Sequence, residues 1–229
     1  MIKVVIFDLD DTLISESDFA YSAFNEISLY LSDILCCKSE HIIKEMKDLY
    51  IIEPKNIFDR LFVLHGAKLQ NNVKEKLISM YRNHYPKLVL SLEVKDLLKT
   101  LKQKGFKLGI ITDGYKESQR NKLDSLNMTD MIDNIIVTDE LGRDYWKPNP
   151  KAFEMMKEFF NVRFSEMIYV GDNPNKDFIA PAMLGMRYAM LRKNNSLYQK
   201  NYEKENCLSQ IPILTRLDEL FQYLESEKS

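Results

Sequence analysis

The chain has 229 residues, which is enough for one large domain or for a core domain with a smaller accessory domain. Its 32 lysine and arginine residues nearly balance 34 aspartate and glutamate residues, so the formal net charge is −2. This balance argues against nucleic acid or an anionic membrane surface as the main partner, because proteins that bind these usually carry a basic excess.

No apolar run approaches the ~20 residues that a membrane-spanning helix needs. The N-terminal apolar run meets Asp8 too early to form the apolar part of a secretory signal. The three cysteines, two of them adjacent at Cys36 and Cys37, suggest neither a disulfide framework nor a Cys-x-x-Cys zinc site. We therefore expect a protein of the reducing cytoplasm, and the sequence leaves its oligomeric state open.

Short runs rich in β-branched and aromatic residues predict strands that are buried on both faces. These runs lie at 2–7, 108–111, 134–137, 167–170 and, more weakly, 187–191. Apolar residues at helical spacing, at 94–101 and 152–160, lie between the later runs. This alternation predicts an α/β fold, a Rossmann-like parallel sheet with helices on both faces.

The segment 14–86 breaks the alternation, because it holds four amphipathic stretches and no strand-like run. A connection of this length is too long for an ordinary loop in a compact fold. We interpret 14–86 as an inserted all-helical, four-helix cap domain, and 1–13 with 87–229 as the Rossmann-like catalytic core. Near the C-terminus, the polar segment 193–210 predicts a surface loop, and apolar residues within 217–224 predict a last helix.

Residues able to do chemistry follow four of the predicted strands. They are Asp8 and Asp10 after the first strand, Thr112 after the second, Lys147 past a loop after the third, and Asp172 and Asp177 after the fourth. In an open parallel sheet, ligands bind at the carboxyl ends of the strands. Crowded carboxylates need a cation or a shared proton, and magnesium is a natural choice. The threonine and the lysine supply the donors and the positive charge that a transferring phosphoryl group requires.

The segment Asp8-Leu9-Asp10-Asp11-Thr12, with Thr112, Lys147 and Gly171-Asp172-x4-Asp177, resembles the four signature motifs of the haloacid dehalogenase-like hydrolase superfamily. The likeness covers essentially the whole chain, and the helical insertion resembles the C1-type cap of that family. The resemblance implies a phosphatase that acts on small phosphomonoesters, such as a sugar phosphate or a nucleotide-like metabolite.

For catalysis, the resemblance implies that Asp8 is the nucleophile and forms an aspartyl-phosphate. Asp10 would be the general acid for the leaving oxygen and then the general base for the attacking water. Thr112 and Lys147 would bind the phosphoryl oxygens. Asp8 and Asp10 also fit these roles chemically, because side chains two residues apart on a strand point to the same side.

For the metal, the resemblance implies a Mg²⁺ ion held by the Asp8 carboxylate, the backbone carbonyl of Asp10 and Asp172. Asp177 would lie behind these ligands, near Lys147. Asp11 stands where the family often has glycine, and Asp113 where it often has asparagine. We assign both to positioning of the backbone.

Other functions remain open within the same fold. True dehalogenases and phosphonatases lack an acid at the position of Asp10, so they are disfavoured. A phosphosugar mutase or phosphotransferase, or a non-catalytic phosphate-binding protein, remains an alternative. A Ser-His-Asp hydrolase is disfavoured because His41, His65 and His84 all lie in the predicted cap.

Basic residues of the predicted cap are expected on solvated helix faces rather than in contact with substrate. They are Lys55, Arg60, Lys68, Lys74 and Arg82. The cap sequence does not identify the substrate.

Overall fold

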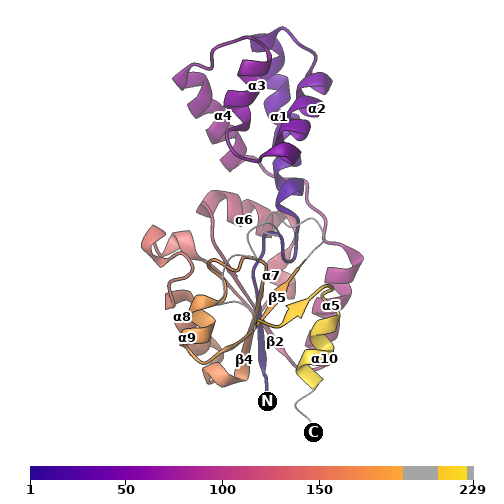
Figure 1. Cartoon of the computed structure of the whole chain (residues 1–229). Coiled ribbons are helices and arrows are strands. Elements are labelled where there is room, and N and C mark those ends of the chain that lie inside the picture. The colour runs from indigo at the N-terminus through magenta and orange to yellow at the C-terminus, as the bar shows by residue number, and fades with distance from the viewer. Residues whose placement is uncertain (193–210, 226–229) are drawn as a thin grey trace. The chain divides into compact units, whose positions relative to one another are not determined.

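The computed structural model of the chain describes residues 1–192 and 211–225 (Figure 1). The chain divides into two compact units, a core unit formed by Met1–Ser15 with Val89–Ser229, and a helical unit formed by Glu16–Leu88. The sequence predicts boundaries at 14 and 86, and the assignment of the helical unit as a cap stays a prediction. The loop predicted at 193–210 lies outside the described residues.

The core unit contains a parallel sheet whose strands run in the order β3-β2-β1-β4-β5-β6. Their bounds are Val4–Phe7 (β1), Lys107–Thr112 (β2), Asn134–Val137 (β3), Met167–Gly171 (β4), Arg187–Leu191 (β5) and Ile213–Leu214 (β6). Phe7 lies beside Ile110 of β2 and Val170 of β4, so Asp8 leaves the sheet between two neighbouring strands that end nearby. Strands β1 to β5 match the five predicted runs, whereas the two residues of β6 are too few to show a pattern.

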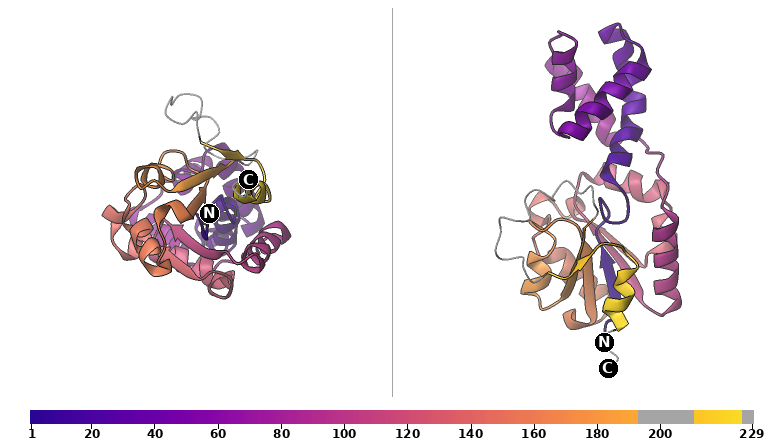
Figure 2. Two further views of the ribbon diagram at one scale, coloured as in Figure 1. Left: turned by 90° about the horizontal axis from the view of Figure 1, so that it is seen from below. Right: turned by 45° about the vertical axis from the view of Figure 1, so that its right-hand side comes forward.

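Helices cover both faces of this sheet (Figures 1 and 2). They are α5 (Leu92–Gln103), α6 (Lys116–Ser125), α7 (Met128–Met131), α8 (Lys151–Phe160), α9 (Ile179–Met183) and α10 (Glu219–Glu225). On one face, Phe153 and Met156 of α8 and Ala180 of α9 pack against Ile6 and Tyr169 of the sheet. Helices α5 and α10 lie on the other face. The predicted α/β fold with a Rossmann-like parallel sheet is confirmed.

The strands and helices of the core unit follow the hydrophobic pattern of the chain. All four residues of β1 are fully buried, as expected for a central strand with both faces covered. Helix α5 buries four apolar residues, and the hydroxyl of Ser91 caps it by accepting a hydrogen bond of 3.2 Å from the Val94 amide. Helix α6 differs, because Ser118, Gln119 and Lys122 are among its buried residues.

The helical unit consists of α1 (Glu16–Leu35), α2 (Ser39–Ile52), α3 (Ile57–Leu64) and α4 (Asn71–Asn83), which are the four predicted helices. The unit has its own apolar core, in which Phe24, Ile27, Met46, Leu61 and Leu77 are fully buried. None of the helices in the described part of the chain is long and apolar enough to cross a membrane.

Two of the basic residues assigned to solvated faces contact other residues of the helical unit. The Arg60 guanidinium donates hydrogen bonds to the carbonyl oxygens of Leu49, at 3.1 Å, and Glu53, both at the end of α2. The Lys74 ammonium lies 2.7 Å from a carboxylate oxygen of Asp59. Both residues remain partly exposed, as expected for solvated faces, and a helix C-terminus and a neighbouring acid provide partners for them.

Candidate active site

The turn that follows β1 carries the first two predicted acids. The Asp8 amide donates a 2.8 Å hydrogen bond to Val170 of β4, which extends the strand pairing up to the carboxylate. Asp11 has a φ of 52°, in the left-handed region that favours glycine and tolerates aspartate. This backbone conformation explains why aspartate replaces glycine here, and it supports the assignment of Asp11 to backbone positioning.

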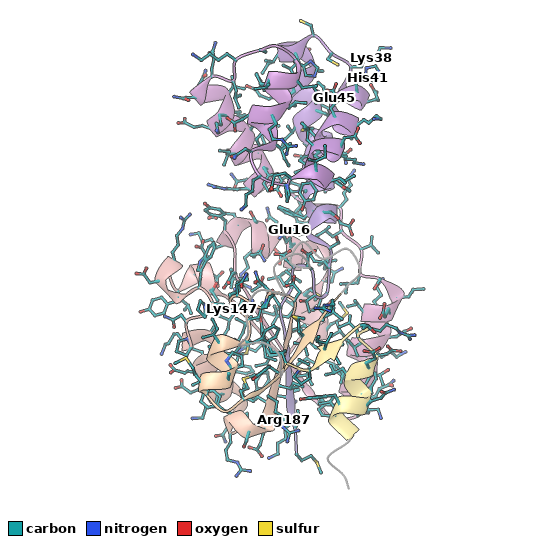
Figure 3. All side chains as sticks on the ribbon, in the orientation of Figure 1. Glu16, Lys38, His41, Glu45, Lys147 and Arg187 are labelled. Carbon is teal, nitrogen blue, oxygen red and sulfur yellow. The ribbon has the colours of Figure 1, made fainter. Side chains whose placement is uncertain are left out.

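Lys147 lies within the core unit (Figure 3), and its side chain is completely buried. Its ammonium group is 2.9 Å from an Asp8 oxygen and 2.8 Å from an Asp177 oxygen. It also donates a 2.8 Å hydrogen bond to the Tyr169 hydroxyl. The structure therefore brings Asp8, Lys147 and Asp177 together. Tyr169, which sequence reasoning did not single out, orients the same ammonium group.

The surrounding charges set the protonation states of this group. Burial raises the pKa of Asp8 to about 6, against the opposing effect of the Lys147 ammonium. Burial alone would lower the pKa of Lys147, but the charges of Asp177 and Asp8 outweigh it and raise the pKa well above its ordinary value. At neutral pH, Asp8 is therefore mainly a carboxylate that faces a permanently charged lysine.

The loop after β4 is built around the Asp177 carboxylate. One of its oxygens accepts hydrogen bonds from the backbone amides of Asp172, at 3.2 Å, and Asn173, at 2.9 Å. A Cβ atom at Gly171 would collide with the same carboxylate. Glycine at 171 therefore lets Asp177 approach the backbone, and Asp177 in turn fixes the position of Asp172.

Asp8, Asp172 and Asp177 form a buried cluster with the properties of a metal site. Each offers a carboxylate oxygen, and these oxygens lie within 4.8 Å of one another. Within the described residues, Oδ2 of Asp172 is buried without a hydrogen-bond partner. Burial and the charges of Asp8 and Asp177 raise the pKa of Asp172 to about 9. A buried oxygen without a donor, beside two further carboxylates, fits a hard divalent cation.

Two residues of α6 that the sequence analysis missed contact Asp10, and one of them also contacts Thr112. The Gln119 amide group donates to Thr112 Oγ1 at 2.6 Å and to Asp10 Oδ2 at 2.9 Å. The Lys122 ammonium group lies 2.7 and 2.8 Å from the two Asp10 oxygens. The available signal was two polar residues three positions apart in the segment that follows Thr112, because that spacing places them on one face of a helix.

Asp113 positions the backbone around Lys147. It accepts hydrogen bonds from the Lys147 amide at 3.1 Å and from the Thr138 hydroxyl at 2.7 Å, and its other oxygen lies 3.1 Å from the Lys176 ammonium. Burial would raise the pKa of Asp113, but Lys147 and Lys176 together lower it. The positioning role assigned to Asp113 fits these contacts. Lys176, a second, partly exposed cation beside the cluster, was missed although it stands between the two predicted acids Asp172 and Asp177.

Comparison with known proteins places this site in a family. Residues 5–191 match the family described as haloacid dehalogenase-like hydrolase. That range includes the four motifs, from Asp8 to Asp177, and most of the chain. The chain therefore belongs to the haloacid dehalogenase-like hydrolase family, as the motifs predicted.

Curated relatives give the class of enzyme. A protein named glyceraldehyde 3-phosphate phosphatase from Pyrococcus furiosus is 30% identical over 99% of this chain and 94% of its own length. A protein named pyrophosphatase PpaX from Bacillus mycoides is 24% identical over 95% of this chain and 99% of its own length. Family and relatives together identify the chain as a phosphatase, which confirms the predicted class.

Solved structures agree on the fold. A structure described as a HAD phosphatase from Thermococcus onnurineus covers 100% of both chains with a TM-score of 0.62 and 25% identity. One described as a putative beta-phosphoglucomutase from Thermotoga maritima has a TM-score of 0.68 at 16% identity, over 99% of this chain and 100% of the other. The second likeness concerns the fold alone.

Proposed function

We propose that this chain is a magnesium-dependent phosphatase that hydrolyses a small phosphomonoester through an aspartyl-phosphate on Asp8. The observation that carries the proposal is the buried group at the ends of β1 and β4. In it, Lys147 lies between Asp8 and Asp177, and Asp172 points an unpaired oxygen into the same cluster. Such a group combines an ionised nucleophile, a fixed positive charge and a metal-binding edge, which are the parts that phosphoryl transfer needs.

In the first step, an Asp8 oxygen attacks phosphorus and the ester oxygen departs with a proton from Asp10. In the second step, Asp10 takes a proton from water as the water attacks phosphorus, and the Asp8 carboxylate is released. Lys147 and the Thr112 hydroxyl hold the phosphoryl oxygens throughout. Asp8, Asp172 and the backbone carbonyl of Asp10 would hold Mg²⁺, with Asp177 behind them, and the ion would neutralise charge on the phosphoryl group.

For the substrate, we propose glyceraldehyde 3-phosphate as the first compound to test, because the curated relatives that carry this name are similar over most of the chain. Pyrophosphate is the second candidate, from the similarity to the pyrophosphatase. We also propose that the helical unit acts as the cap and selects among such substrates, while the core unit performs the chemistry.

The test is release of inorganic phosphate by the purified protein from a panel of phosphate esters, with and without excess chelator. We expect release with Mg²⁺, loss of release in chelator, and recovery when Mg²⁺ is added back. Release in chelator at the full rate would contradict the metal site. Transfer of the phosphoryl group to a sugar, without net release of phosphate, would favour the phosphotransferase alternative.

A further inference from the structure

The Asp10 carboxylate is contacted by side chains that have no part in the reaction proposed for Asp8, Thr112 and Lys147. Both oxygens of the Asp10 carboxylate are contacted by one ammonium group, that of Lys122, at 2.7 and 2.8 Å. The Lys122 side chain is only 4% exposed, whereas that of Asp10 is 21% exposed. The lysine thus approaches Asp10 from the protein interior and leaves the partly open side of the carboxylate toward solvent.

Gln119 adds a second contact from the same helix. Its amide nitrogen lies 2.9 Å from Asp10 Oδ2 and 2.6 Å from Thr112 Oγ1. The amide nitrogen carries two protons, so one can go to each neighbour. Because Thr112 then accepts from Gln119, its own hydroxyl proton stays available for a phosphoryl oxygen. A single side chain therefore links the acid–base residue to the phosphate-binding hydroxyl.

The two donors are held as a unit. Gln119 and Lys122 are three residues apart in α6, so they lie on the same face of that helix. Both are buried, together with Ser118 and Leu123. A helix that buries a lysine and a glutamine toward one carboxylate leaves Asp10 little freedom to rotate, because the donors share a rigid backbone.

We propose that Gln119 and Lys122 are positioning residues. Both orient the Asp10 carboxylate for proton transfer to the leaving oxygen, and Gln119 also orients the Thr112 hydroxyl toward a phosphoryl oxygen. This inference rests on the proposed function, in which Asp10 is the general acid. It adds two residues to the reaction, neither of which contacts the transferred phosphoryl group. Proton transfer depends steeply on geometry, so a misplaced Asp10 slows the reactions that need an acid and spares those that do not.

The test compares Lys122→Met and Gln119→Leu with wild type on two substrates that share the phosphoryl group. One is an alkyl phosphate, whose leaving oxygen needs a proton, and the other is an aryl phosphate with an acidic phenol, which leaves without one. The quantity to compare is kcat/KM, which covers the steps up to release of the alcohol. For Lys122→Met we expect a loss of about 10²-fold on the alkyl ester, a value near wild type on the aryl ester, and unchanged inhibition by inorganic phosphate. Gln119→Leu should also lose more on the alkyl ester than on the aryl ester, and it should weaken inhibition by phosphate because Thr112 loses a contact.

Two further variants separate positioning from structure. Lys122→Arg keeps the charge and should recover much of the activity on the alkyl ester. Lys116→Met removes a lysine from the same helix, but the side chain of Lys116 is 57% exposed, so this variant should match wild type on both esters. Melting temperatures show whether each variant folds. If Lys122→Met does not fold, Gln119→Leu and Lys122→Arg test the positioning role.

Equal losses on both esters in either variant, weaker inhibition by phosphate in Lys122→Met, or no loss on the alkyl ester in either variant would overturn the positioning role. These outcomes are distinct from failure of the proposed function, in which wild-type protein releases no phosphate from any ester.

Discussion

The core unit and the helical unit differ in whether they bury charged side chains. Within Glu16–Leu88, all of which the structure describes, the buried polar residues are Ser28 and His84, and every lysine, arginine, aspartate and glutamate is at least partly exposed. In the described part of the core unit, six such residues are buried. They are Asp8, Lys122, Lys147, Glu166, Asp172 and Asp177.

This difference indicates that the chemistry belongs to the core unit, whereas the interior of the helical unit serves packing. A buried charge costs free energy unless it is paired and hydrogen-bonded, and even a well-paired one adds little to stability compared with an apolar core. The helical unit avoids this cost, and its ion pair between Lys44 and Asp48 is exposed and therefore weak. In the core unit, most of the buried charges lie near the carboxyl ends of the strands. A cluster of groups with shifted pKa values in one place is typical of a catalytic site.

The sharpest contrast between the units comes from one lysine in each. Lys147→Ala removes the cation that we assign to the phosphoryl group, so kcat/KM should fall for every ester alike, by about 10²–10³-fold. Lys68→Ala changes an exposed residue of the helical unit, so it should leave hydrolysis of a small activated ester near wild type, and any effect should be on the ranking of substrates. The measurement is a substrate panel, with melting temperatures to check folding.

Lys68 is a better probe than Arg60, whose contacts with α2 carbonyls give it a structural role. If Lys68→Ala lowered all substrates equally and Lys147→Ala only reordered them, the division of labour between the units would be wrong.

Metal binding gives a contrast that does not depend on turnover. Mg²⁺ should raise the melting temperature of the wild-type protein, since a ligand that binds only the folded state at 100 times its Kd adds about 2.7 kcal/mol. Asp172→Asn should lose most of this shift, because it removes the unpaired carboxylate oxygen of the cluster. Asp48→Asn, an equivalent change at an exposed site in the helical unit, should keep it. A full shift in Asp172→Asn would exclude Asp172 as a ligand.

The smallest effect is expected at Glu166, a buried acid directly before β4 and away from the site. The Lys3 ammonium, at 2.7 Å, and hydrogen bonds from Arg163 lower the pKa of Glu166 from 4.5 to about 2. A lowered pKa stabilises the folded state at pH values above 4.5, and this contribution disappears as the pH falls toward 2. Glu166→Gln should therefore have a lower melting temperature than wild type at pH 7, and it should keep its kcat. The difference in melting temperature should become smaller as the pH is lowered. A difference that stays constant across this pH range would refute the ion-pair explanation.

The sequence predicted the parts of the fold that have a strong hydrophobic pattern. Strands β1 to β5 are buried runs, and α1 to α4 carry apolar stripes, so periodicity alone finds them. The same reasoning missed α6, because three of its four buried residues are polar and leave no apolar stripe. That gap hid Gln119 and Lys122, whose role depends on a contact with Asp10 more than a hundred positions away in the chain.

The residues of the motifs were predictable because strand ends in a parallel sheet converge. Asp8, Lys147 and Asp177 meet as that rule requires. Tyr169 and Lys176 contribute through side-chain contacts that no spacing rule encodes, so they appear only in the folded structure.

The central claim is that Asp8 carries the phosphoryl group, and trapping the intermediate tests it most directly. In Asp10→Asn, an aryl phosphate with an acidic phenol still phosphorylates Asp8, whereas hydrolysis lacks its general base and slows by about 10²–10⁴-fold. After a rapid acid quench and proteolysis, mass spectrometry should find one phosphoryl group on Asp8, and none in a parallel sample of Asp8→Asn. A phosphoryl group on another residue, or release of phosphate with no labelled peptide, would contradict the account.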